Sequence, residues 1–166
     1  MTATEEVIKW VKEFVEIPHP VFADLPPCPY AKQARLDGKV DFVEVPDNES
    51  DSIVWRIIEK FDPETKDVLV LIAKPDRWTV EETVNLAKEL NDYFKPLNLL
   101  IMEDHPNLVE KVKNVVLNQG KYILFFVQDR IKIAQFEKML RNTDYYKNWD
   151  SKYENEVTGS WRHPVK

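Results

Sequence analysis

Val68-Leu69-Val70-Leu71-Ile72-Ala73 is an uninterrupted apolar run bounded by Asp67 and Pro75. A run of this length with several β-branched residues predicts a strand that is covered on both faces of a sheet. A helix is predicted soon after it, because Thr79 and Glu82 form a capping box and apolar residues follow at helical spacing. A strand followed by a helix is the repeating unit of an α/β protein.

The same unit recurs along the chain. Apolar or alternating segments predict further strands over 40–45, 97–102 and 122–127. Helical spacing predicts helices over 2–16, 51–61, 79–94 and 131–140. Asn107 caps a further predicted helix over 108–117, although its valines are poor helix formers and leave a strand at 115–117 as the alternative. This order favours an α/β fold with a four-stranded, mainly parallel sheet and helices against it, and a ferredoxin-like α+β sandwich is the alternative.

Length and composition are those of an ordinary globular domain. The chain has 166 residues, of which 43% are apolar and 31% are charged, so a single α/β domain over 1–166 is predicted. Residues 142–166 lose the helical pattern but carry several Tyr and Trp residues. Disordered tails are poor in aromatic residues, so this extension is expected to pack back on the domain.

Charge and residue usage disfavour several classes of partner and cofactor. A net charge of −6 without a basic run gives no electrostatic reason to bind nucleic acid or an anionic membrane. The apolar runs are far shorter than the ~20 residues that span a bilayer. Only three glycines occur, and they are not clustered, so no nucleotide cofactor is expected. A single cysteine fits a reducing compartment and predicts a cytoplasmic protein, while the oligomeric state stays open.

One stretch stands out for chemistry. Residues 18–30 hold five of the eleven prolines and the only cysteine, Cys28. Proline fixes φ and removes a backbone donor, so a stiff loop is predicted that places this thiol. Cys28 would act as a nucleophile or a metal ligand if nearby Lys32 and Arg35 lowered its pKa. The alternative is a buried, inert thiol, because free cysteine is among the most buried residue types.

A second candidate group follows the third predicted strand. Alternation places Glu103 and His105 on one side of that strand, where they can serve as a general base or a ligand. Cys28, His105 and Glu103 are therefore the predicted catalytic residues, and the alternative for His105 is a role in starting the next segment. His19, Cys28 and His105 form a candidate set for a divalent metal such as zinc, although their spacing matches no standard zinc motif.

Three arginines complete the predicted pocket. Arg35, Arg77 and Arg130 lie in or next to predicted loops at one edge of the sheet. A guanidinium group recognises carboxylate and phosphate, so these residues are predicted to bind a small anionic substrate. Ordinary loop polarity is the alternative for each of them.

A short motif resembles a known family. After the N-terminal helix, Leu25-Pro26-Pro27-Cys28-Pro29-Tyr30-Ala31-Lys32 is similar to the Leu-Asn-Leu-Cys-Pro-Phe-Ala-Lys motif of a family of small bacterial proteins of unknown function. His105-Pro106 resembles a His-Pro that follows a later strand in that family. The family's Asn-Arg-Ser-Pro-Tyr-Pro segment has no counterpart here. The resemblance draws attention to Cys28 and His105 and implies no reaction.

The functional expectation is a small cytosolic enzyme that uses Cys28 with His105 on a small anionic substrate. One alternative is a non-catalytic interaction or regulatory protein that docks a protein partner through the proline-rich loop and the aromatic tail. The other alternative is a metal-binding protein that uses His19, Cys28 and His105.

Overall fold

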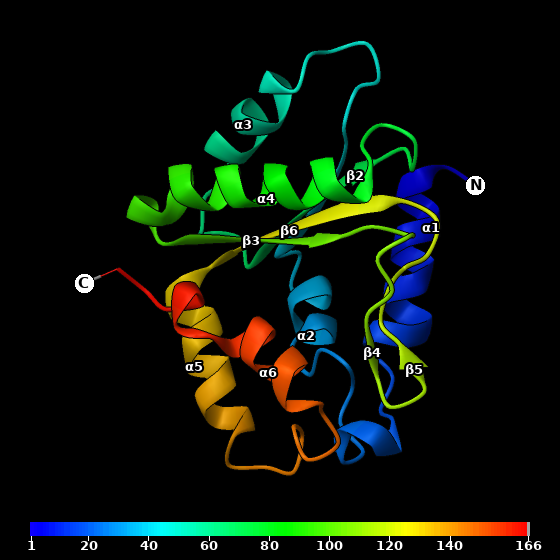
Figure 1. The fold of residues 1–166 in the computed structure, drawn as a ribbon, viewed down its shortest axis with the longest axis vertical. Helices are drawn as coiled ribbons and strands as arrows, with labels where there is room; N and C mark the ends of the chain where they lie inside the picture. Colours follow the sequence, from blue (N-terminus) through cyan, green and yellow to red (C-terminus); the bar gives the residue numbers. More distant parts are fainter. Residues whose placement is uncertain (166) are drawn as a thin grey trace.

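A four-stranded mixed sheet forms the centre of the protein (Figure 1). The structure is a computed structural model, and it describes residues 1–165. The strands are β1 (Val40–Glu44), β2 (Val68–Ala73), β3 (Leu99–Asp104) and β6 (Ile123–Asp129), in the spatial order β1-β2-β6-β3. β1 is parallel to β2, whereas β6 is antiparallel to both β2 and β3. The predicted α/β class is confirmed.

The mainly parallel arrangement is not found, and the reason lies in the connection between β3 and β6. The predicted helix over 108–117 is replaced by a small hairpin of β4 (Lys111–Val112) and β5 (Val115–Val116), which turns at Lys113 with φ 54. A parallel return to the sheet needs a long crossover, usually a helix. The chain returns without such a helix, so β6 enters antiparallel between its neighbours. The alternative prediction for this segment, a strand at 115–117, agrees with β5 at Val115–Val116.

Two helices cover one face of the sheet. They are α3 (Ser52–Glu59) and α4 (Val80–Phe94), and α4 begins at Thr79 with the predicted capping box. Buried side chains from both helices pack against alternate residues of the strands. The core of this layer includes Val54, Ile58, Leu71, Leu90, Phe94, Ile101 and Phe125.

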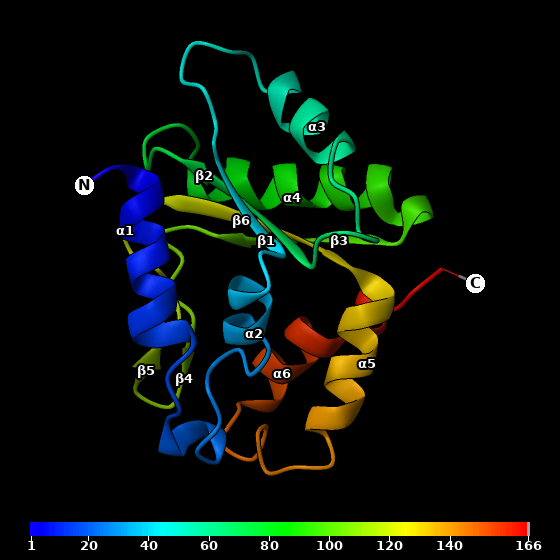
Figure 2. The ribbon, with the colours of Figure 1, turned by 180° about the vertical axis from the view of Figure 1, so that it is seen from behind.

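The opposite face carries the remaining helices (Figures 1 and 2). They are α1 (Ala3–Trp10), α2 (Ala31–Leu36), α5 (Arg130–Leu140) and α6 (Ser151–Thr158), and α1 continues into a π-helical turn over Val11–Val15. Val7 of α1 packs directly on β2 and β6. Helices on both faces do not fit the ferredoxin-like alternative, in which they cover one face of the sheet.

The aromatic tail lies against the proline-rich loop. Tyr145 is buried and stacks on Phe22, with ring centroids 5.3 Å apart. The Tyr145 hydroxyl donates to the carbonyl of Pro27, and the Asn148 amide donates to the carbonyl of Val21 at 3.0 Å. Residues 142–165 therefore join the N-terminal and C-terminal parts of the chain on the second face of the sheet. No helix in residues 1–165 is long and apolar enough to cross a membrane.

Candidate functional site

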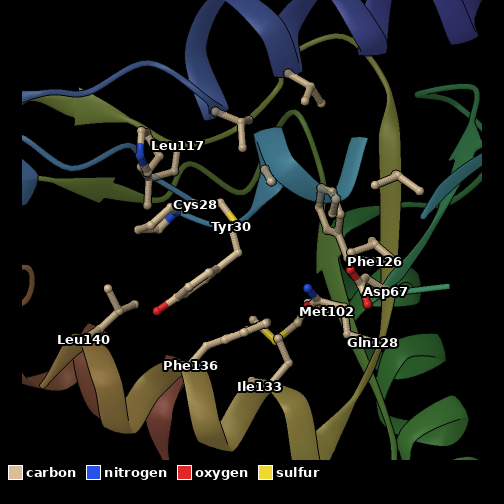
Figure 3. Close-up of a pocket in the computed structure, with 18 of the residues that line it drawn as sticks. Cys28, Tyr30, Asp67, Met102, Leu117, Phe126, Gln128, Ile133, Phe136 and Leu140 are labelled. Atoms are coloured by element: carbon tan, nitrogen blue, oxygen red, sulfur yellow. The ribbon is translucent and has the colours of Figure 1, made fainter. Parts of the chain in front are cut away.

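A cavity of about 350 Å³ lies between the second face of the sheet and the helices that cover it (Figure 3). One wall is the sheet, through Met102 and Phe126 and their neighbours. The other walls come from α1 with its π-helical turn, the proline-rich loop, α2, α5 and the tail. Most of the lining is apolar, and it includes Trp10, Phe14, Phe42, Val70, Ile133 and Leu140.

The cavity exists because α5 turns away from the sheet. Only α1 packs closely on this face, through Val7. Arg130, at the start of α5, is held at the sheet edge by a bond from its Nε to the carbonyl of Leu99 at 2.8 Å, and the helix then runs away from the strands. Its apolar side chains meet α2 and the proline-rich loop and leave open volume next to Phe126.

The proline-rich loop is pinned at several points. His19 and Leu25 form a β-bridge, and the His19 Nδ1 accepts from the backbone N–H of Val21 at 3.0 Å. The backbone N–H of Cys28 donates to the carbonyl of Val15 at 3.2 Å. These contacts fix the position of the Cys28 side chain, which lines the cavity.

A pair of stacked rings forms part of the cavity wall between this loop and α5. The rings of Tyr30 and Phe136 lie 3.9 Å apart between centroids with an interplanar angle of 15°. Both side chains line the cavity and are half-buried, so they cover one side of it. Figure 3 shows the Tyr30 ring extending from the loop toward Leu140 and Phe136.

The environment of Cys28 keeps its thiol protonated. Burial raises the pKa of Cys28, the negative charge of Glu16 raises it further, and backbone N–H groups of Tyr30 and Ala31 oppose this effect. The expected cation, Arg35, is engaged elsewhere, because its Nε and Nη2 bind the two Glu16 oxygens at 2.6 and 2.9 Å. A neutral thiol is a poor nucleophile, so Cys28 serves as a weakly polar part of the cavity wall.

His105 belongs to a different part of the molecule. It is buried with 2% exposure, its Nε2 lies 2.9 Å from the carbonyl of Trp78, and its Nδ1 accepts from the backbone N–H of Asn107 at 3.0 Å. A ring with the proton on Nε2 satisfies both contacts. The role that this geometry supports is the structural alternative, in which the imidazole holds the segment after β3.

The sheet separates Cys28 from His105. Met102 lines the cavity, whereas Ile101 points into the core under α4, and strand alternation places Glu103 on the side of Ile101. His105 lies on the same side of the sheet as Ile101 and Glu103, and its Nε2 contacts the carbonyl of Trp78 in that layer. Burial raises the pKa of Glu103, and Glu103 does not line the cavity. The predicted catalytic set of Cys28, His105 and Glu103 is therefore not assembled in one site.

The predicted metal site is not assembled either. Within the part of the chain that the structure describes, no three His, Cys, Asp or Glu side chains gather closely enough to hold a metal ion. His19 lies in the loop with Cys28, but His105 lies across the sheet. The set of His19, Cys28 and His105 therefore has no common centre.

The three predicted anion-binding arginines are all bonded within the protein. Arg35 pairs with Glu16. Arg77 donates from Nη1 and Nη2 to the carbonyls of Pro46 and Glu49 at 2.7 and 2.8 Å, and so fixes the loop before α3. Arg130 is fully buried and donates to backbone and amide oxygens rather than to a carboxylate. Their geometry supports structural roles.

Sequence reasoning missed the charged pair on the cavity wall. Arg162 lies in the aromatic tail, is only 6% exposed, and forms an ion pair with Glu137 of α5 at 2.8 Å. Both side chains line the cavity. The segment Trp161-Arg162-His163-Pro164 is too short and irregular to carry a periodic signal. Arg162 reaches the cavity wall only because the fold places the aromatic tail against α5.

Comparison with known proteins adds no relative. Neither a protein-family model, nor a curated protein, nor a solved structure matches this chain. The resemblance of residues 25–32 to a bacterial family therefore stays a prediction.

Proposed function

We propose that this protein binds one small, mainly apolar molecule in the cavity beneath the sheet. The observation that carries this proposal is the cavity itself, with a volume of about 350 Å³ and a predominantly apolar lining. Small-molecule sites in proteins have volumes of roughly 300–1,000 Å³, apolar walls and a few polar groups. An apolar cavity of about 150 Å³ holds one benzene-sized molecule, so this cavity suits a molecule of roughly two to three rings.

The energy of packing supports a binding role. Protein interiors are close-packed, and hollows larger than a water molecule are few. This pocket of about 350 Å³ is an exception, because its largely apolar walls do not pack against other side chains. A bound apolar molecule would gain free energy by burying its own surface against the lining, at about 25 cal/mol for each Å² of apolar surface removed from water.

The polar groups at the cavity fit recognition better than catalysis. The Cys28 thiol is neutral, and the imidazole of His105 lies on the other side of the sheet. Lys132 is held by the carbonyl of Pro63 at 2.6 Å and by Asp67 at 3.2 Å. No side-chain hydrogen bond of Gln128 is found within residues 1–165, so its amide is free to bind a ligand. These groups can orient a bound molecule.

A fluorescence titration tests the proposal. N-phenyl-1-naphthylamine is a neutral, two-part aromatic probe whose emission rises in an apolar site. We expect saturable binding to one site per chain. Val70→Phe places a ring in the cavity and should weaken binding at least about tenfold, because it removes the space that the probe needs. Val84→Phe on the exposed side of α4 is the matched control and should bind like the wild type. Absence of saturable binding, or equal binding by Val70→Phe, would refute the proposal.

A further inference from the structure

The buried guanidinium of Arg162, a residue that lines the cavity, has unused hydrogen-bonding capacity. Its Nη1 lies 2.8 Å from the Oε1 of Glu137, yet the approach is poorly directed, and neither atom makes a hydrogen bond. Its Nε is buried and has no hydrogen-bond partner in the described part of the chain. A buried polar group without a partner costs about 1–3 kcal/mol, and more when it is charged. A guanidinium that lines a ligand-sized cavity in this way calls for a functional explanation.

The charges around Arg162 do not balance. Arg130 is fully buried beside it and donates to the carbonyl of the preceding residue, Trp161, but it has no carboxylate partner among residues 1–165. Glu137 is the one acidic side chain that pairs with Arg162. Arg141 is neutralised separately by Glu154 at 2.8 Å. Arg130, Arg162 and Glu137 together therefore carry one net positive charge in a poorly solvated region.

The pKa shifts of Glu137 and Arg162 also indicate that this charged region is poorly solvated. Burial raises the pKa of Glu137, although the charges of Arg162, His163 and Arg141 oppose that effect. Burial also lowers the pKa of Arg162, which reflects the poor solvation of its charge. Glu137 is thus a weak counter-ion, and a second anion would relieve a cost that the protein alone leaves in place.

We infer that the bound molecule carries a carboxylate, which the guanidinium of Arg162 receives while its apolar body fills the cavity toward Phe126 and Met102. This inference rests on the proposed function and specifies the ligand class as an apolar monocarboxylic acid. The planar N–H groups of a guanidinium match a carboxylate in geometry and in charge. An apolar amine, which is positively charged, would be repelled by the net positive charge of this group. An uncharged alcohol would leave that charge without a counter-ion.

A matched series of ligands tests this inference. 2-Naphthoic acid, 2-naphthalenemethanol and 2-naphthylmethylamine share an apolar body and differ in their polar group. Each is titrated against the wild-type protein loaded with N-phenyl-1-naphthylamine, and displacement of the probe is measured at pH 7.5. The acid should bind at least about tenfold more tightly than the alcohol, and the amine should bind most weakly. Equal binding of acid and alcohol, or failure of the acid to displace the bound probe, would overturn the inference, while failure of the probe to bind would instead contradict the proposed function.

Variants separate a direct role of Arg162 from a structural one. Arg162→Gln should reduce acid binding to the level of the alcohol and leave alcohol binding within about twofold of the wild type. Lys138→Gln removes a charge from an exposed position of α5, next to Glu137 in sequence, and should change neither. An equal loss for acid and alcohol in Arg162→Gln would mean that the arginine only shapes the cavity. If that variant does not fold, Glu137→Gln decides, because removal of the competing carboxylate should strengthen acid binding and leave the alcohol unchanged. An unchanged ratio of acid to alcohol binding in Glu137→Gln would overturn the inference.

Discussion

Glu110 makes the stability of this protein depend on pH in a direction that its environment dictates. It lies in the hairpin arm between β3 and β6, and its Oε2 accepts from the Tyr153 hydroxyl of α6 at 2.8 Å. Burial raises the pKa of Glu110 from 4.5 to about 7, and nearby Asp104, Glu103 and Glu156 add to that shift, whereas the Tyr153 bond opposes it. The side chain is therefore protonated in the folded protein at pH values where the unfolded chain has lost the proton.

The sign and size of the effect follow from linkage. Between pH 4.5 and about 7 the folded state holds one more proton at Glu110 than the unfolded state does, so the free energy of unfolding falls as pH rises through this window. Each unit of pKa difference corresponds to about 1.4 kcal/mol, which gives an upper limit of about 3 kcal/mol. The side chain is only half-buried, so solvent screening reduces the expected loss to about 1–2 kcal/mol.

The test is Glu110→Gln, which keeps the shape of the neutral side chain. Urea unfolding at pH 4.5, 6, 7 and 8 should show the variant and the wild type equally stable at the lowest pH. At pH 8 the variant should be more stable by about 1–2 kcal/mol. Glu64→Gln, at an exposed position, is the control and should follow the wild type at every pH. A constant difference between Glu110→Gln and the wild type across this range would refute the reasoning.

Three further outcomes are expected. Val70→Phe should raise the free energy of unfolding without ligand by about 1 kcal/mol by filling part of the cavity, and Val84→Phe should not; a destabilised Val70→Phe would indicate that no room exists there. Cys28 in the native protein should react slowly with Ellman's reagent at pH 8, because burial raises its pKa, and N-phenyl-1-naphthylamine should slow the reaction further. Rapid labelling that the probe does not affect would place the thiol outside the cavity. Arg130→Met should cost at least about 2 kcal/mol in urea unfolding, because it removes the side-chain donor to the buried carbonyl of Leu99 and two partly buried hydrogen bonds to Asn91 and Trp161, and an unchanged midpoint would contradict that role.

The sequence pattern predicts the strands and long helices well, for identifiable reasons. β2 was predicted at its observed bounds, because an apolar run between Asp67 and Pro75 leaves few alternatives. α4 begins at the predicted capping box of Thr79 and Glu82. These signals are local, and local chemistry is sufficient to produce them. The direction of β6 is not local, because it depends on whether residues 108–117 form a crossover helix or a hairpin.

The candidate site was predicted only in part. The proline-rich loop places Cys28 on a cavity, but that cavity lies under one face of the sheet and not at the edge beside Arg77 where the pocket was expected. The expected partner of Cys28, His105, lies on the other side of the sheet. Strand alternation determines which face of the sheet His105 is on, but the sequence does not show which face the proline-rich loop covers. Arg162 gave no usable signal, since an arginine in a polar tail is ordinarily solvated. Long-range packing decides each of these points.

The paired rings of Tyr30 and Phe136 have a kinetic consequence. A molecule of two rings cannot pass between these two side chains while they remain in contact, so entry on this side of the cavity requires the proline-rich loop and the middle of α5 to separate. Such separation costs the same stacking energy whether a guest enters or leaves. Passage between the rings should therefore be slow in both directions, and a guest should exchange through the open part of the cavity instead.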